Sequence, residues 1–367
     1  MSRFTTIIFL TFITLGSMAQ PSTLPITKVL VKNILQNVSY IPSKSFVSRS
    51  YSGSDTGNSY ISKFATNHSF YISKFEVTNK EYREFVQYVR DSTAHSLLKH
   101  FKENSFVIDW NQPINWNDPL LNPMMLSPEE RISGKLELNP NKIRYEIDFL
   151  CDKETTNIYP DTLVWISDFA FSNNELQAKH YFSNSKYDDY PVVGVNLKQA
   201  MAYCQWKTDQ VNKLLIKNEN QYKILIRLPT NIEWEAAAND DNVKEKIFSP
   251  GKSYQSNFGN MKDNNGLVVK GFQDDGYFYT APVKSYDPGP YKLYNMKGNV
   301  AEWTSTSREE LMNVEVKEEK QKTSFIVKGG GWNSIPYYLQ TGVCQFFLYE
   351  SAHSFIGFRY VVYIIKK

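Results

Sequence analysis

The chain has 367 residues, of which 41% are hydrophobic and 15% aromatic, which is enough for one large or two ordinary domains with a well-filled core. Its formal net charge of +3 is close to neutral for this length. The sequence contains no block of Lys and Arg, so a nucleic-acid partner is not expected.

The N-terminal residues have the pattern of a secretion signal. A single Arg precedes an apolar run over residues 4–15, and Ser17-Met-Ala19 has the small-x-small form of a cleavage site. The run is too short to span a bilayer, and no later segment has the pattern of a transmembrane helix. We therefore expect residues 1–19 to be a signal peptide and the protein to be exported, to the periplasm or the outer membrane. No Cys follows the apolar run, so a lipid anchor is not expected.

Three helix starts carry a capping box, in which two side chains and two backbone amides bond reciprocally. The boxes are Thr78–Glu81, Asn196–Gln199 and Thr230–Glu233. Apolar residues follow the first box at helical spacing: Tyr82, Phe85, Val86 and Val89. We predict a helix with a buried face after each box.

The rest of the chain is dominated by turn-forming residues. Clusters of Gly, Pro, Asn, Asp and Ser separate short apolar runs such as Phe70–Ile72, Pro191–Val193 and Phe325–Val327. This pattern predicts a loop-rich α+β domain over residues 20–367, with short strands and few helices. Residues 104–189 show weak periodicity and are predicted to be a long insertion, whose aromatic residues argue against full disorder.

Cysteine and histidine usage gives little sign of a metal centre. The three cysteines, Cys151, Cys204 and Cys344, leave at least one free thiol. Cys204 falls on the predicted core face of the second helix, so we interpret it as a buried apolar residue. None of the five histidines share the i, i+4 spacing that places two imidazoles on one helical face. We interpret all five as surface or hydrogen-bonded residues.

The most informative stretch is Lys328–Ser334, which reads K-G-G-G-W-N-S. It resembles the R-G-G-S-[FW]-x-C segment of the formylglycine-generating enzyme (sulfatase-modifying factor) family. Further motifs resemble that family in the same order along the chain: Arg227–Glu235, Leu293–Trp303 and Gly357–Arg359. The resemblance covers nearly the whole predicted mature chain and implies a variant of the C-type-lectin fold.

The resemblance also identifies what is missing. In the enzymes of the family, the cysteine of this segment and a second one five residues later bind copper, whereas the chain has Ser334 and Leu339 there. Copper(I) prefers thiolates, so neither copper nor formylglycine-type activity is expected, and Cys344 alone cannot form a two-thiolate site. A nucleophilic Ser334 would need a base, for which only His353 is a candidate, so we interpret it as a loop serine.

Calcium is the metal that the resemblance does imply. One structural site would use the side chains of Asn257 and Asp275 with the backbone oxygens of Phe258 and Tyr277. A second would use the side chains of Asn295 and Glu302 with the backbone oxygens of Gly298 and Val300. These are oxygen ligands of the kind calcium takes. The alternative is that Asn295 and Glu302 only cap turns around Gly298. Two arginines, Arg227 and Arg359, are expected to fix loops through bidentate hydrogen bonds.

Some segments resemble one branch of the family more specifically. They are Tyr159–Trp165, Tyr187–Val193 and Tyr337–Gly342, and they resemble the gliding-motility lipoproteins of the GldK/PorK and GldJ type, which serve the type IX secretion machinery of the Bacteroidota. The chain departs from that branch in lacking a lipobox cysteine and in reading I-P-S-K-S-F at Ile41–Phe46 in place of I-P-G-G-x-F.

The resemblance implies a non-catalytic exported scaffold subunit that binds envelope proteins, such as secretion-ring subunits, in a hetero-oligomeric ring. The alternative is an enzyme of altered chemistry, or a lectin-like ligand-binding module, in the same fold. An open polar pocket near Ser334, Trp332 and Arg359 would favour the alternative. A pocket filled by the side chains of Phe346, Phe347 and Tyr349 would exclude a substrate.

Overall fold

The computed structural model describes residues 36–51, 59–131, 134–169, 174–217, 221–239, 277–314 and 323–366. The predicted signal peptide and three predicted calcium ligands, Asn257, Phe258 and Asp275, lie outside these ranges. None of the helices in the described part of the chain combines the length and the apolar character that crossing a membrane requires.

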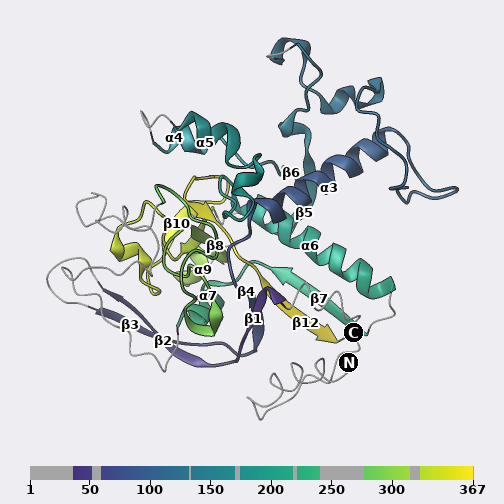
Figure 1. Ribbon diagram of the computed structural model, residues 1–367. Coiled ribbons are helices and arrows are strands. Elements are labelled where there is room, and N and C mark those ends of the chain that lie inside the picture. Colours follow the sequence, from purple (N-terminus) through teal and green to yellow (C-terminus); the bar gives the residue numbers. More distant parts are fainter. Residues whose placement is uncertain are drawn as a thin grey trace, which may run out of the picture.

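The described strands form two four-stranded sheets and two hairpins (Figure 1). The first sheet is antiparallel, in the order β1 (Val38–Ile41), β4 (Phe70–Ser73), β12 (Val361–Lys366), β7 (Tyr222–Arg227). The second has the order β10 (Gln345–Leu348), β9 (Ser324–Lys328), β8 (Ala301–Ser307), β11 (Ile356–Gly357), with β11 parallel to β8. The hairpins pair β2 (Ser45–Tyr51) with β3 (Ser59–Ala65), and β5 (Arg144–Phe149) with β6 (Asp152–Asn157).

The three capped helices are present where the sequence predicts them. They are α3 (Asn79–Leu97), α6 (Leu197–Lys217) and α7 (Asn231–Ala238). Both reciprocal bonds of each box form, as between the Asn196 and Gln199 side chains and each other's backbone amides at 2.9 Å. Shorter α-helices are α4 (Val164–Ser167), α5 (Glu175–His180) and α9 (Arg308–Leu311). The 3₁₀ turns are η1 (Pro119–Met124), η2 (Pro128–Glu130), η3 (Pro140–Lys142), η4 (Ser185–Tyr187), η6 (Pro290–Lys292) and η8 (Pro336–Leu339).

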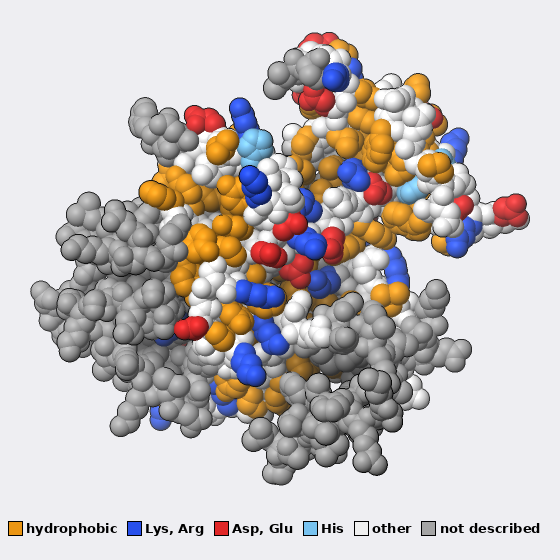
Figure 2. All heavy atoms as spheres, in the orientation of Figure 1, with side chains coloured by type: hydrophobic (Ala, Val, Ile, Leu, Met, Phe, Trp, Pro, Cys, Tyr) orange, Lys and Arg blue, Asp and Glu red, His pale blue; other side chains and the backbone are white. Residues whose placement is uncertain are grey.

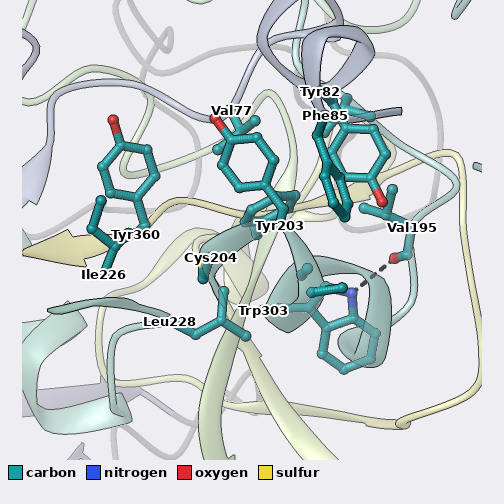
Figure 3. Close-up of a cluster of buried hydrophobic side chains, with 14 of the residues drawn as sticks. Val77, Tyr82, Phe85, Val195, Tyr203, Cys204, Ile226, Leu228, Trp303 and Tyr360 are labelled. Atoms are coloured by element: carbon teal, nitrogen blue, oxygen red, sulfur yellow. Dashed lines mark hydrogen bonds between the residues drawn. The ribbon is translucent and has the colours of Figure 1, made fainter. Parts of the chain in front are cut away.

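Aromatic rings dominate the main core, where α3 and α6 pack together (Figures 1 and 3). Tyr82 of α3 stacks on Tyr203 of α6 with ring centroids 5.7 Å apart, and Phe358 meets Tyr82 edge-on at 6.2 Å. Cys204 lies in the same cluster at 2% exposure, which confirms its interpretation as a buried apolar residue. Trp303 of β8 donates its ring N–H to the Val195 backbone oxygen, so the sheet and the start of α6 are joined by a satisfied polar contact.

The described part of residues 104–189 is ordered into short elements. The β5–β6 hairpin packs against α6. The segment that follows α3 projects from the body of the molecule (Figure 1), and its residues Leu121, Met124 and Met125 form a small core with Ala94 at the end of α3. The apolar run Pro191–Val193 forms no strand. It makes only an isolated bridge with Thr78, because proline has no backbone N–H to offer to a ladder.

Candidate functional site

The glycine-rich turn that follows β9 is held by its own backbone and by Ser334. Gly329 and Gly330 have φ values of +87° and +67°, which favour glycine, and a Cβ on Gly330 would lie 2.9 Å from the Tyr338 backbone oxygen. The Gly331 N–H donates to the Ser334 hydroxyl oxygen at 2.9 Å, and the Ser334 N–H donates to the Gly331 oxygen at 2.9 Å. Ser334 is 7% exposed. The hydroxyl therefore closes the turn, as expected for a loop serine.

The second position that the resemblance assigns to copper also lacks a metal ligand. Leu339 is buried, and its side chain packs against Gly330. Cys344 lies nearby, with its sulfur 3.5 Å from Lys328 Nζ and 3.6 Å from Asn231 Oδ1. Cys204 belongs to the core and Cys151 is exposed, and all three thiols are free. The turn therefore brings together one thiol, one hydroxyl and one alkyl group.

Lys328, the last residue of β9 before this turn, is a buried cation. Its Nζ donates to Glu235 Oε1 at 2.8 Å, and the two side chains are 0% and 2% exposed. The other carboxylate oxygen, Oε2 of Glu235, is buried and has no hydrogen-bond partner. Burial raises the pKa of the Cys344 thiol, although the Lys328 charge opposes the rise. The thiol is therefore protonated at neutral pH and a poor nucleophile.

A second buried cluster surrounds Arg359. Its guanidinium donates to both oxygens of Glu302, at 2.5 and 2.6 Å, and to the backbone oxygens of Ser73 and Tyr294 at 3.0 and 2.8 Å. The Trp234 ring N–H donates to Glu302 at 2.7 Å. Arg359 thus joins β4, β8 and the loop before β8, as its bidentate interpretation predicts. Arg227 makes a comparable fork to Glu233, at 2.8 and 2.7 Å.

Glu76 is the functional candidate that sequence reasoning missed. It is fully buried, and its two oxygens accept from the Asn295 and Asn299 side-chain amides, each at 2.9 Å. Burial raises the pKa of Glu76 to about 8; the Arg359 charge opposes this rise and Glu302 adds to it. A carboxylate between the apolar residues Phe75 and Val77, just before the first capping box, was the available signal.

The described members of the two predicted calcium sites lie in different surroundings. Asn295 lies against Glu76, and its Oδ1 is buried without a hydrogen-bond partner. Glu302 is close enough to influence Glu76, but both of its oxygens face Arg359. Gly298 has a φ of +119°, in the turn that joins Asn295 to Val300. Tyr277 is the one described member of the other predicted site, and its hydroxyl accepts from Ser285 at 3.4 Å.

Aromatic side chains cover Trp332, and they are not the three named in the sequence analysis as possible occupants of the pocket. Its ring lies 4.9 Å from Tyr279, 5.0 Å from Phe169 and 6.2 Å from Trp165, measured between centroids. The three residues that would have marked a filled pocket pack elsewhere: Phe346 beside Arg308, Phe347 beside Trp303 and His353, and Tyr349 beside Phe149.

His353, the candidate base, is bound to another residue. Its Nδ1 lies 2.9 Å from Asp168 Oδ1, while Ser354 donates its N–H and hydroxyl to Asp168 Oδ2 at 2.6 and 2.8 Å. Burial alone would raise the pKa of Asp168, but these hydrogen bonds outweigh it and hold the pKa below its ordinary value. The pair fastens the segment around α4 to the loop before β11. All five histidines are exposed or hydrogen-bonded, as predicted.

These features define the class of protein. The family model of the sulfatase-modifying factor enzyme 1-like domain matches residues 40–364, and the chain belongs to this family. The structure of PvdO from Pseudomonas aeruginosa has a TM-score of 0.50 at 15% identity, covering 89% of this chain and 93% of that one, which shows the fold alone. The predicted loop-rich α+β fold of this family is confirmed.

Curated relatives include both catalytic and inactive proteins. The inactive C-alpha-formylglycine-generating enzyme 2 of Bos taurus is 33% identical over 120 residues, which is 32% of this chain and 33% of that protein. The formylglycine-generating enzyme of Streptomyces coelicolor is 32% identical over 122 residues, 32% of each chain. The chain thus spans about a third of the length of these relatives. Family membership by itself leaves activity open.

Proposed function

We propose that this protein is a non-catalytic exported scaffold subunit that binds other envelope proteins. The observation that carries the proposal is the state of the two copper positions: Ser334 closes a backbone turn and Leu339 is a buried alkyl group. Neither replaces a thiolate as a copper(I) ligand. The existence of inactive relatives in the family supports the same conclusion.

Burial around the turn argues against the alternative enzyme or lectin-like module. A substrate site needs accessible polar groups, but Trp332, Ser334 and Arg359 are 4%, 7% and 0% exposed. Their polar atoms are bonded within the protein, as in the Trp332 ring N–H to the Ser354 oxygen at 3.0 Å. This geometry favours a turn that supports loops over one that receives a ligand.

The projecting segment supports a binding role. It exposes large hydrophobic side chains, with exposed fractions of 96% for Phe106, 58% for Val107, 46% for Trp110 and 53% for Leu120. In Figure 2, hydrophobic side chains gather along this part of the molecule with isolated charges between them. Apolar groups displayed away from the main core are typical of protein–protein contact surfaces. We propose that the partners are secretion-ring subunits, following the resemblance to the GldK/PorK and GldJ branch of the Bacteroidota.

The test is cross-linking in the native envelope followed by affinity purification and mass spectrometry. Wild-type protein should recover the same envelope subunits reproducibly, and Phe106→Asp should reduce that recovery several-fold. Leu348→Asp, which places the same charge on an exposed residue of β10, is the matched control and should behave like wild type. Recovery of the wild-type chain only as a free monomer would contradict the proposal.

Calcium binding by the Glu76 cluster is part of the same proposal. Asn295 offers a buried, unpaired amide oxygen, and Glu76 is a buried carboxylate that a cation would stabilise in its charged form. Amide, carboxylate and backbone oxygens are ligands that calcium takes. Glu302 would either remain bound to Arg359 alone or also bind the ion together with Glu76. The bound ion would hold together the loops that carry Glu76 and Asn295.

Thermal unfolding with calcium and with a chelator tests this. An ion at about 100 times its Kd adds about 2.7 kcal/mol, so Tm should rise by roughly 5 °C. Glu76→Gln should reduce the rise, whereas Glu175→Gln, at an exposed position at the start of α5, should not. An unchanged Tm in wild type would remove calcium from the proposal and leave the scaffold role standing.

A further inference from the structure

Two histidines meet where α3 joins the projecting segment. His95 lies in the last turn of α3 and His100 begins the hairpin that follows. Their Nδ1 atoms are 3.1 Å apart, and their ring centroids are 5.3 Å apart. The five-residue spacing gave no reason to expect this, because residues five apart do not share a face of a continuous helix.

The backbone between the two rings explains the approach. The helix ends at Leu97, and Lys99 adopts a φ of +58°, which reverses the chain. The His100 N–H then donates to the His95 oxygen at 2.9 Å, and the Asp109 N–H donates to the His100 oxygen at 2.9 Å. Both histidines are therefore fixed by main-chain bonds that do not depend on the interaction between their rings.

Packing fixes the His95 ring further. His95 is 3% exposed, and Trp110 lies edge-on to its ring at 5.2 Å. Trp110 in turn stacks on Tyr88 of α3 at 5.2 Å. His100 is partly exposed, so one side of the pair is open to solvent. A ligand pair held in this way loses little conformational freedom when it binds an ion.

The separation of the two nitrogens matches two ligands of one metal ion. With metal–nitrogen bonds of about 2.0–2.1 Å, ligands at angles of about 90° to 109° have nitrogens roughly 2.9–3.4 Å apart. The observed 3.1 Å falls inside this interval. Without metal, the same distance requires one ring to donate its Nδ1–H to the other. Binding would need only that this ring carry its proton on Nε2 in place of Nδ1.

We propose that His95 and His100 form a two-imidazole site for a single borderline divalent transition-metal ion of the Zn²⁺, Cu²⁺ or Ni²⁺ class. Imidazole suits these ions, whereas calcium and magnesium prefer oxygen. In the described part of the chain no third His, Cys, Asp or Glu completes a cluster, so water or a group from another molecule takes the remaining positions. The bound ion would tie the hairpin, with its exposed Phe106, to the end of α3.

The test is calorimetric titration of Zn²⁺ into untagged, EDTA-stripped full-length protein, with calcium present to occupy oxygen sites. Wild type should bind one equivalent. His100→Gln, at the partly exposed ligand, should weaken this binding by more than about tenfold, since even changes behind a ligand weaken metal binding by roughly 10–100-fold. His180→Gln, at an exposed histidine of α5, is the matched control and should bind like wild type.

A second measurement uses the neighbouring tryptophan. One equivalent of Cu²⁺ should quench part of the tryptophan emission in wild type, and Trp110→Phe should remove that part. The quenching should also be lost in His100→Gln, whose folding is checked by circular dichroism. The proposal is wrong if wild type binds no stoichiometric Zn²⁺, or if His100→Gln binds it as tightly as wild type. The two histidines would then share a hydrogen bond and form no metal site.

Discussion

Two buried pairs of a cation and a carboxylate differ in how completely they are satisfied. Arg359 and Glu302 are 0% and 1% exposed, and Lys328 and Glu235 are 0% and 2% exposed. Both oxygens of Glu302 accept from Arg359 and one also from Trp234, whereas Glu235 Oε2 has no hydrogen-bond partner. A buried ion pair is tolerated when hydrogen bonds offset its desolvation, so the first pair is a structural clamp and the second is under-satisfied.

The largest effect should come from breaking the clamp. Arg359→Met leaves Glu302 buried without its cation and removes three bonds to backbone oxygens, so the free energy of unfolding should fall by about 4 kcal/mol. Arg227→Met is the matched control: the Arg227 side chain is one-third exposed, although Glu233 is 9% exposed, so about 1 kcal/mol is expected. Urea denaturation measures both. Equal losses would mean that burial does not separate the two arginines.

Glu76, beside the clamp, should make stability depend on pH. Burial raises its pKa from 4.5 to about 8, so the folded state holds the proton more tightly than the unfolded chain. The contribution is complete below about pH 4.5 and is lost as pH rises towards 8, and the loss reached by pH 7 is about 3 kcal/mol. In chelator, wild type should therefore lose stability across this window relative to Glu76→Gln, whose amide cannot ionise. Parallel curves for the two proteins would show that Glu76 is already charged at pH 5.

Breaking the under-satisfied pair should lower the free energy of unfolding less than breaking the clamp does. Lys328→Met leaves Glu235 buried, but one oxygen of this carboxylate already lacks a hydrogen-bond partner, so fewer bonds are lost than at the clamp and a loss of about 2 kcal/mol is expected. Replacing both partners, Lys328→Met with Glu235→Gln, should recover part of it. Urea denaturation measures these variants as well. If Lys328→Met loses as much stability as Arg359→Met, the two buried pairs do not differ in their contribution.

The smallest effect should be at Cys344, whose sulfur contacts Lys328 of the under-satisfied pair and Asn231. Because burial raises its pKa, its thiol should react with a disulfide reagent far more slowly than the exposed Cys151 at pH 7.5. Cys344→Ser should change the free energy of unfolding by less than about 1 kcal/mol. Rapid labelling of Cys344 in the folded protein would instead indicate an activated thiol.

Local features could be predicted from the sequence, and distant contacts could not. The boxes at Thr78, Asn196 and Thr230 each involve residues three apart, so their bonds follow from spacing alone. The contact between Asn299 and Glu76 joins residues 223 apart, and only the folded chain brings them together. His95 and His100 are near in sequence but meet through the left-handed Lys99, a conformation that lysine does not signal.

The position of β12 has a consequence for the order in which the chain folds. This strand lies between β4 and β7 in the first sheet, although it follows both in sequence. Until residues 361–366 have been made, β4 and β7 lack the strand that pairs with both of them. Arg359, just before that strand, has not yet reached Glu302. The first sheet and the clamp can therefore form only after the last segment is delivered. Because these contacts join residues far apart in the sequence, they form late in folding.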